Sequence, residues 1–158
     1  VRGVKYLGYS FYVMKGKCQL TVHPKSKAKM KSRLKELTSR SNGWGYAKRK
    51  QKLNEYIRGW VGYYHLANMK RLLHETDEWL RHRIRMCIWK AWKKAKTKVA
   101  NLIRCGINKY QAYEWGNTRK GYWRIADSPI LKMAIDNNKL RSAGYATLME
   151  AYLEWYPK

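Results

Sequence analysis

One stretch of the chain, residues 53–98, constrains the fold more than any other. Its apolar residues recur at steps of three and four, which is the repeat of one face of an α-helix. The repeat stops at Ala67-Asn68 and restarts at Met69. We therefore predict two long helices that share an apolar seam, made of Leu53, Tyr56, Ile57, Trp60, Val61 and Tyr64 in the first helix and Met69, Leu72, Leu73, Thr76, Leu80, Ile84, Cys87, Ile88, Ala91, Ala95 and Val99 in the second.

Basic residues fill the positions between these apolar residues. The 158-residue chain has 35 Lys and Arg against 10 Asp and Glu, a formal net charge of +25. Such a charge repels itself in a folded domain and is best tolerated when an anionic partner neutralises it. Nucleic acid is the first candidate partner. An anionic membrane surface comes second, and basicity without a partner comes third.

The N-terminal part predicts a β-hairpin followed by a helix. Residues 4–22 alternate and are rich in Val and Tyr, with a turn at Lys15-Gly16-Lys17. Pro24 then opens a helix that is expected to end at Leu37 or Thr38. This helix carries two rows of cations in which successive members are four residues apart. One row is Lys27, Lys31 and Lys35, and the other is Lys25, Lys29 and Arg33. Like charges at this spacing destabilise an isolated helix by about 0.2–0.5 kcal/mol per pair, so the rows indicate either a phosphate backbone along the helix or a solvated helix face.

The second long helix is expected to run from about Met69 to about Ile103. Trp89 falls off its apolar seam and sits among basic residues. An exposed ring in that position is typical of nucleobase stacking. The alternative is that a neighbouring segment covers it.

The C-terminal third predicts short elements. Around Gly121, the stretch 117–129 alternates the cations Arg119, Lys120 and Arg124 with the rings Tyr122 and Trp123. This pattern favours a basic loop that contacts backbone phosphates and stacks on bases, against the alternative that its rings tuck into the core. The other expected elements are helices over 109–115, 129–136 and 146–155, with Gly106 ending the long helix and a linker over 137–144.

No stretch predicts a catalytic or metal site. The acids are scattered, the four histidines have no ligand spacing, and no Asp-Asp, HExxH, P-loop or GxSxG element is present. The three cysteines, Cys18, Cys87 and Cys105, form no CxxC pattern, which is typical of a reducing cytoplasm rather than of zinc binding or disulfides. No apolar run is long enough to span a bilayer, and no signal peptide is evident.

Four stretches, in order, resemble the C-terminal part of group II intron-encoded reverse transcriptases, also called maturases. Tyr6-Leu7-Gly8-Tyr9 resembles the element that closes the polymerase palm of that family, and residues 53–64 are similar to its maturase-specific, X or thumb pattern. Residues 83–86, followed by Trp89 and Trp92, also match this pattern. Residues 117–124 resemble the segment after the thumb that is assigned to DNA binding in the short bacterial members.

The resemblance implies a mainly α fold, with a three-helix thumb-like bundle between a β-hairpin and short helices. Residues 1–23 would end the palm, residues 24–103 would form the thumb or X domain, and residues 104–158 would be a basic DNA-binding segment. The catalytic palm, with its Mg²⁺, would precede Val1, so we expect a fragment with no catalytic residue, metal or cofactor of its own.

The expected partners are intron RNA, the template–primer RNA/DNA duplex and target DNA, in the bacterial cytoplasm, with no membrane and no small-molecule substrate. Phosphate contacts and base stacking would provide the binding. The predicted nucleic-acid-binding residues are Lys27, Lys31, Lys35, Arg58, Arg71, Arg81, Arg85, Trp89, Lys93, Arg119, Lys120, Trp123 and Arg124, with Trp115 and Tyr122 as further stacking candidates.

Two alternatives stay open from the sequence. The first is an independent basic helical module that binds nucleic acid without a polymerase parent. The second is a basic amphipathic protein of the membrane surface. The coding sequence just before Val1 would decide between the polymerase parent and the independent module, and liposome co-sedimentation would test the membrane reading.

Overall fold

A computed structural model describes residues 4–156 of the chain. Strands β1 (Tyr9–Met14) and β2 (Lys17–Val22) pair antiparallel, with Tyr9 opposite Val22 and Met14 opposite Lys17. Lys15 and Gly16 both have positive φ, at 51° and 73°, which is the backbone that a two-residue hairpin turn needs to match the strand twist. The predicted hairpin is therefore confirmed. Residues 1–3 of the proposed palm segment 1–23 lie outside the described residues.

Helix α1 (Pro24–Leu37) begins and ends where the sequence predicts. The His23 imidazole accepts a hydrogen bond from the Lys25 N–H at 3.1 Å, and Pro24 stands at the first helical position, where its missing N–H costs nothing. Met30, Leu34 and Leu37 form the buried stripe. The cation rows are left on the outside of the helix.

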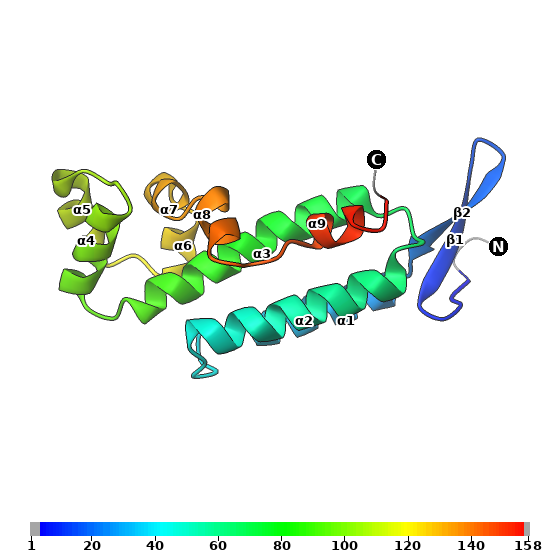
Figure 1. Cartoon of the computed structure of the whole chain (residues 1–158), viewed down its shortest axis with the longest axis horizontal. Coiled ribbons are helices and arrows are strands. Elements are labelled where there is room, and N and C mark those ends of the chain that lie inside the picture. Colours follow the sequence, from blue (N-terminus) through cyan, green and yellow to red (C-terminus); the bar gives the residue numbers. More distant parts are fainter. Residues whose placement is uncertain (1–3, 157–158) are drawn as a thin grey trace.

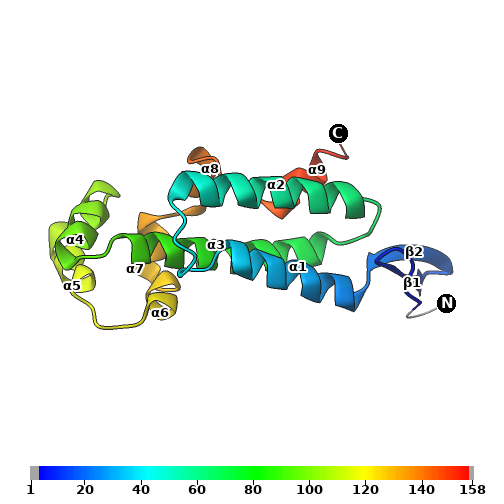
Figure 2. The same cartoon turned by 90° about the horizontal axis from the view of Figure 1, so that it is seen from below.

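Helices α2 (Tyr46–Tyr64) and α3 (Lys70–Ala91) complete a three-helix bundle with α1. Figures 1 and 2 show these three long helices side by side, with the hairpin at one end of the bundle. Leu53 and Ile57 of α2 and Leu73 and Leu80 of α3 are buried between them. The predicted class, a mainly α fold with a bundle after a β-hairpin, is confirmed.

The single helix expected from Met69 to Ile103 is wrong. Helix α3 ends at Ala91, and a separate helix α4 (Ala95–Arg104) pairs with α5 (Lys109–Gly116) beyond the end of the bundle (Figure 1). A Cβ atom at Gly116 would lie 2.5 Å from Val99 Cγ2, so α4 and α5 approach closely there. The break lets Val99 pack against a partner, whereas a straight continuation would carry its side chain past the bundle.

Four short helices follow and pack against the bundle, the first of them against α3 and the last against both α2 and α3. They are α6 (Tyr122–Ala126), α7 (Pro129–Ala134), α8 (Asn137–Ser142) and α9 (Leu148–Leu153). The predicted loop 117–129 thus contains a helix, and so does the predicted linker 137–144, where Asp136 accepts a hydrogen bond from the Lys139 N–H at 2.8 Å. The terminal helix is shorter than the predicted 146–155.

No helix within residues 4–156 combines the length and the apolarity needed to cross a membrane.

A buried carboxylate attaches the last helix to the central one. Asp77 of α3 accepts hydrogen bonds from the Leu148 N–H at 2.8 Å and the Met149 N–H at 3.0 Å, and Thr147 accepts one from the Glu150 N–H at 3.1 Å. Burial raises the pKa of Asp77, and the two backbone hydrogen bonds oppose that increase. The first N–H groups of α9, which have no partner within the helix, are satisfied in this way.

Replacement of Asp77 tests this attachment. We expect Asp77→Ala to lower the free energy of unfolding by about 1–3 kcal/mol, because two backbone donors lose their acceptor where water is excluded. Asp77→Asn should cost less, because its amide oxygen still accepts one bond and carries no charge to desolvate. Urea denaturation followed by circular dichroism measures both variants. Equal stabilities for Asp77→Ala and the wild type would contradict the assignment.

Candidate nucleic-acid interface

The lysine row Lys27, Lys31 and Lys35 lies on the side of α1 that borders α3. The Lys31 Nζ atom sits 4.9 Å from the ring centroid of Trp79 on α3. Lys27 lines a surface hollow together with Arg71 of α3. The structure therefore brings these predicted residues onto one surface, although Arg71 also pairs with Glu75 at 2.9 Å.

Arg83 joins α3 to the end of α1. Its Nε atom donates to Thr38 Oγ1 at 2.7 Å, and its Nη2 atom donates to the carbonyls of Lys35 and Thr38 at 3.2 and 3.1 Å. The Cys87 thiol also donates to the Thr38 carbonyl, at 3.1 Å. A cation at a helix C-terminus is favourable because the last carbonyls lack partners and carry the negative end of the helix dipole. These bonds fix the position of the Arg83 guanidinium.

Arg83 also lies between two tryptophan rings. Its Cζ atom is 5.4 Å from the ring centroid of Trp79 and 5.9 Å from that of Trp123 in α6. On α3, the His82 ring stacks on Trp123, with centroids 3.4 Å apart and planes 15° apart. Cations within about 6 Å of an aromatic face are attracted to it, so this packing holds Trp123 at the surface with 41 % of its area exposed.

The alternation of cations and rings continues along α6. The Arg40 Cζ atom lies 5.2 Å from the ring centroid of Tyr122, and the Lys98 Nζ atom lies 5.8 Å from the same centroid. We call the connected set the cation–aromatic strip. It consists of Lys31, Trp79, Arg83, Trp123, Tyr122, Arg40 and Lys98.

The charges of the strip are not neutralised by acids. Within residues 4–156, none of its cations forms an ion pair. Burial is the largest influence on Arg83 and lowers its pKa, and burial likewise lowers the pKa of Lys98. Partly desolvated cations without carboxylate partners gain from an approaching anion, because their attraction to it is weakly screened.

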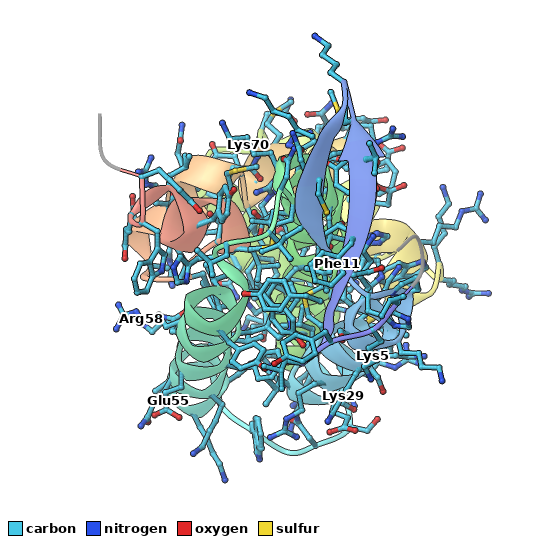
Figure 3. The ribbon with its side chains drawn as sticks, turned by 90° about the vertical axis from the view of Figure 1, so that its right-hand side faces the viewer. Lys5, Phe11, Lys29, Glu55, Arg58 and Lys70 are labelled. Atoms are coloured by element: carbon cyan, nitrogen blue, oxygen red, sulfur yellow. The ribbon has the colours of Figure 1, made fainter. Side chains whose placement is uncertain are left out.

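Three other predicted residues are not part of the strip. Arg58 points outward from α2 on the side away from α1 (Figure 3), and it lines a hollow with Trp155. Arg81 lies in a hollow on α3 that also contains carboxylates. Lys93 is exposed after the end of α3.

The predicted C-terminal cations remain at the surface. Arg119, Lys120 and Arg124 are exposed, and the Lys120 Nζ atom lies 5.1 Å from the ring centroid of Trp115, which is half-buried. Tyr122 and Trp123 are the residues of this segment that the structure places in the strip.

Two predicted binding residues are buried, and their assignment is wrong. Only 1 % of Trp89 is exposed, because Trp92 packs against its ring and the Lys98 ammonium covers it at 4.9 Å. Arg85 is 6 % exposed and donates from Nε to the Ile135 carbonyl at 2.7 Å and from Nη2 to Asn137 Oδ1 at 2.8 Å. Burial lowers the pKa of Arg85. Both residues hold the fold together.

Sequence reasoning missed several residues of the strip. Trp79 and Arg83 are four residues apart on one helix, and that spacing was the available signal. The sequence contains no such signal for Arg40 and Lys98, because their positions beside Tyr122 depend on how the short C-terminal helices pack. No group of three or more His, Cys, Asp or Glu within residues 4–156 is arranged to hold a metal ion.

Comparison with known protein families identifies the family of the chain's central part. A family model for the group II intron, maturase-specific domain matches residues 27–106, which is half of the chain. The matched range begins within the first turn of α1 and contains α2, α3 and α4, and so most of the cation–aromatic strip. No curated protein matches the chain.

The structural role of Arg85 can be tested against an exposed cation. We expect Arg85→Met to lower the free energy of unfolding by about 1–3 kcal/mol, because the Ile135 carbonyl loses its buried donor. Lys93→Met, at an exposed site, should change it by no more than about 0.5 kcal/mol. Urea denaturation gives both values, and an Arg85→Met variant as stable as Lys93→Met would show that Arg85 does not anchor α7.

Proposed function

The chain belongs to the group II intron maturase-specific domain family, and we propose that it binds intron RNA through the cation–aromatic strip and so assists splicing of that RNA. The role is binding rather than catalysis, because the strip offers cations and rings. Phosphate contact by the cations supplies affinity, and the rings add contacts with unpaired bases.

The cation–aromatic strip is the observation that carries this proposal. It places cations from α1, α3, α4 and the α1–α2 connection beside rings on one continuous surface, with none of them in an ion pair within the described residues. A net charge of +25 favours the same kind of partner. A structured RNA presents both ligands of such a surface, a phosphate backbone and unstacked bases.

The resemblance to reverse transcriptases supports finer proposals. We propose that residues 24–103 act as the thumb of an RNA-directed DNA polymerase with a Mg²⁺-dependent palm, and that they also hold its template–primer duplex. The exposed cations of residues 104–158, among them Arg119, Lys120 and Arg124, would contact target DNA. A bacterial cytoplasmic enzyme fits these roles.

The salt dependence of RNA binding tests the role of the α1 lysines. The slope of log K against log salt falls by about 0.7–0.9 for each phosphate contact that is lost. We therefore expect the triple variant Lys27→Gln, Lys31→Gln, Lys35→Gln to lower the slope by about 2–3. Fluorescence anisotropy with a labelled intron RNA fragment measures the slope.

A matched triple variant controls for the loss of net charge. Lys17→Gln, Lys25→Gln, Lys29→Gln removes the same charge from exposed positions that lie away from Trp79, and we expect its slope to stay closer to the wild-type value. Equal slopes for the two triple variants would show that the row Lys27, Lys31 and Lys35 has no special part in binding. A wild-type chain that ignored RNA in dilute buffer would overturn the proposed function as a whole.

Trp123 provides a separate test of base stacking. Trp123→Leu should weaken binding of an RNA with unpaired bases by about 1–3 kcal/mol and should change binding of a blunt duplex much less. Trp123→Tyr keeps a ring at this position and should retain most of the affinity. Competition binding with the two RNAs measures the difference, and an equal loss for both would argue against stacking.

A further inference from the structure

A surface hollow of about 360 Å³ lies between the α1–α2 connection and the C-terminal part of α3. Figure 2 shows these two segments side by side. Four cations line the hollow, Arg40, Arg49, Lys90 and Lys93. All ten Asp and Glu side chains of the chain lie within the described residues 4–156, and none of them lines it. We call this hollow the Arg49 pocket.

Arg49 is held in place with a donor to spare. It is 5 % exposed, and its Nη2 atom donates to the Ser39 carbonyl at 3.3 Å and to Asn42 Oδ1 at 3.2 Å. Its Nε atom is buried and has no hydrogen-bond partner among residues 4–156. An unsatisfied donor on a buried cation is costly. A ligand with acceptor oxygens and negative charge would offset that cost.

The other cations of the Arg49 pocket are free to adapt. The Lys90 ammonium donates to the Arg40 carbonyl, which leaves two of its three donors. Arg40 and Lys93 are exposed, and Trp44 forms the rim with the Lys48 ammonium 5.0 Å from its ring centroid. One fixed guanidinium beside flexible cations suits a compact anion with several acceptor oxygens.

We propose that the Arg49 pocket binds a phosphate group, supplied by an internal phosphodiester of the bound RNA. Arginine and lysine together match the several oxygens of a phosphate, and hydrogen bonds between charged groups are stronger than neutral ones. Because a water molecule takes up about 30 Å³ in the liquid, the hollow has room for a phosphate group and its hydration. The choice of RNA as the source rests on the proposed function.

Arg40 connects the Arg49 pocket with the cation–aromatic strip. Arg40 is one of the residues that line the pocket, and its guanidinium carbon lies 5.2 Å from the Tyr122 ring centroid at the end of the strip. An RNA strand that follows the strip from Lys31 toward Tyr122 therefore arrives at the pocket. The pocket fixes one phosphate in place, whereas the exposed α1 lysines attract the backbone without fixing its register.

The Arg49 Nε–H group reports directly on occupancy of the pocket. We would record its ¹⁵N–¹H signal by NMR in the whole chain, assigned by its loss in Arg49→Lys, during titration with inorganic phosphate and, separately, with a 5′-hydroxyl RNA oligonucleotide. Both titrants should shift the signal. The double variant Arg40→Gln, Lys93→Gln should weaken the response to phosphate about tenfold.

Exposed lysines of the hairpin segment provide the matched control. Lys5→Gln, Lys17→Gln removes the same charge at the other end of the molecule, and its phosphate response should equal that of the wild type. Equal weakening by both double variants would overturn the pocket, as would a shift that requires a 5′-phosphate on the RNA. RNA binding without any shift would overturn the pocket and leave the proposed function standing. A shift with inorganic phosphate in a chain that binds no RNA would overturn the proposed function, and with it RNA as the source of the phosphate, and would leave only the phosphate-binding pocket.

Discussion

Helix α3 satisfies the ends of three other helices, in each case with the charge that the helix dipole prefers. Asp77 accepts from the N-terminus of α9, while Arg83 and Arg85 donate to the C-termini of α1 and α7. Helix ends expose unpaired backbone groups and partial charges of opposite sign. The bundle and the layer of short helices are therefore joined through polar contacts with one central helix, in addition to the apolar seam.

The hydrogen-bond acceptors of the buried arginines explain why the folded protein keeps so much net positive charge. Arg49, Arg83 and Arg85 are wholly or partly buried, and each donates to carbonyl or amide oxygens rather than to carboxylates. Neutral acceptors satisfy the hydrogen bonds of a guanidinium without cancelling its charge. Packing thus uses the arginines without removing their attraction for a polyanion.

The bundle could be predicted from the sequence because each helix carries its own repeat, and Leu34, Leu53 and Ile57 are buried as that repeat requires. The end of α3 at Ala91 could not, because the helical pattern continues past it and the break depends on the packing of Val99 against α5. The burial of Trp89 could not be predicted either, because this residue falls off the apolar seam and is covered by Trp92 and Lys98. The surrounding short helices have too few turns for a periodicity to show. The spacing of the α1 lysines identified one side of the interface, while Arg40 and Lys98 depend on contacts between distant segments.

Arg83 belongs to the surface and to the scaffold at once. Its guanidinium holds the Thr38 hydroxyl and carbonyl, and it also faces Trp79 and Trp123. A change at position 83 therefore alters the end of α1 and the spacing of the two indoles together. Across homologous sequences, positions 38 and 83 should vary as a pair, because substitution of one residue alone would leave a polar group of the other without its hydrogen-bond partner.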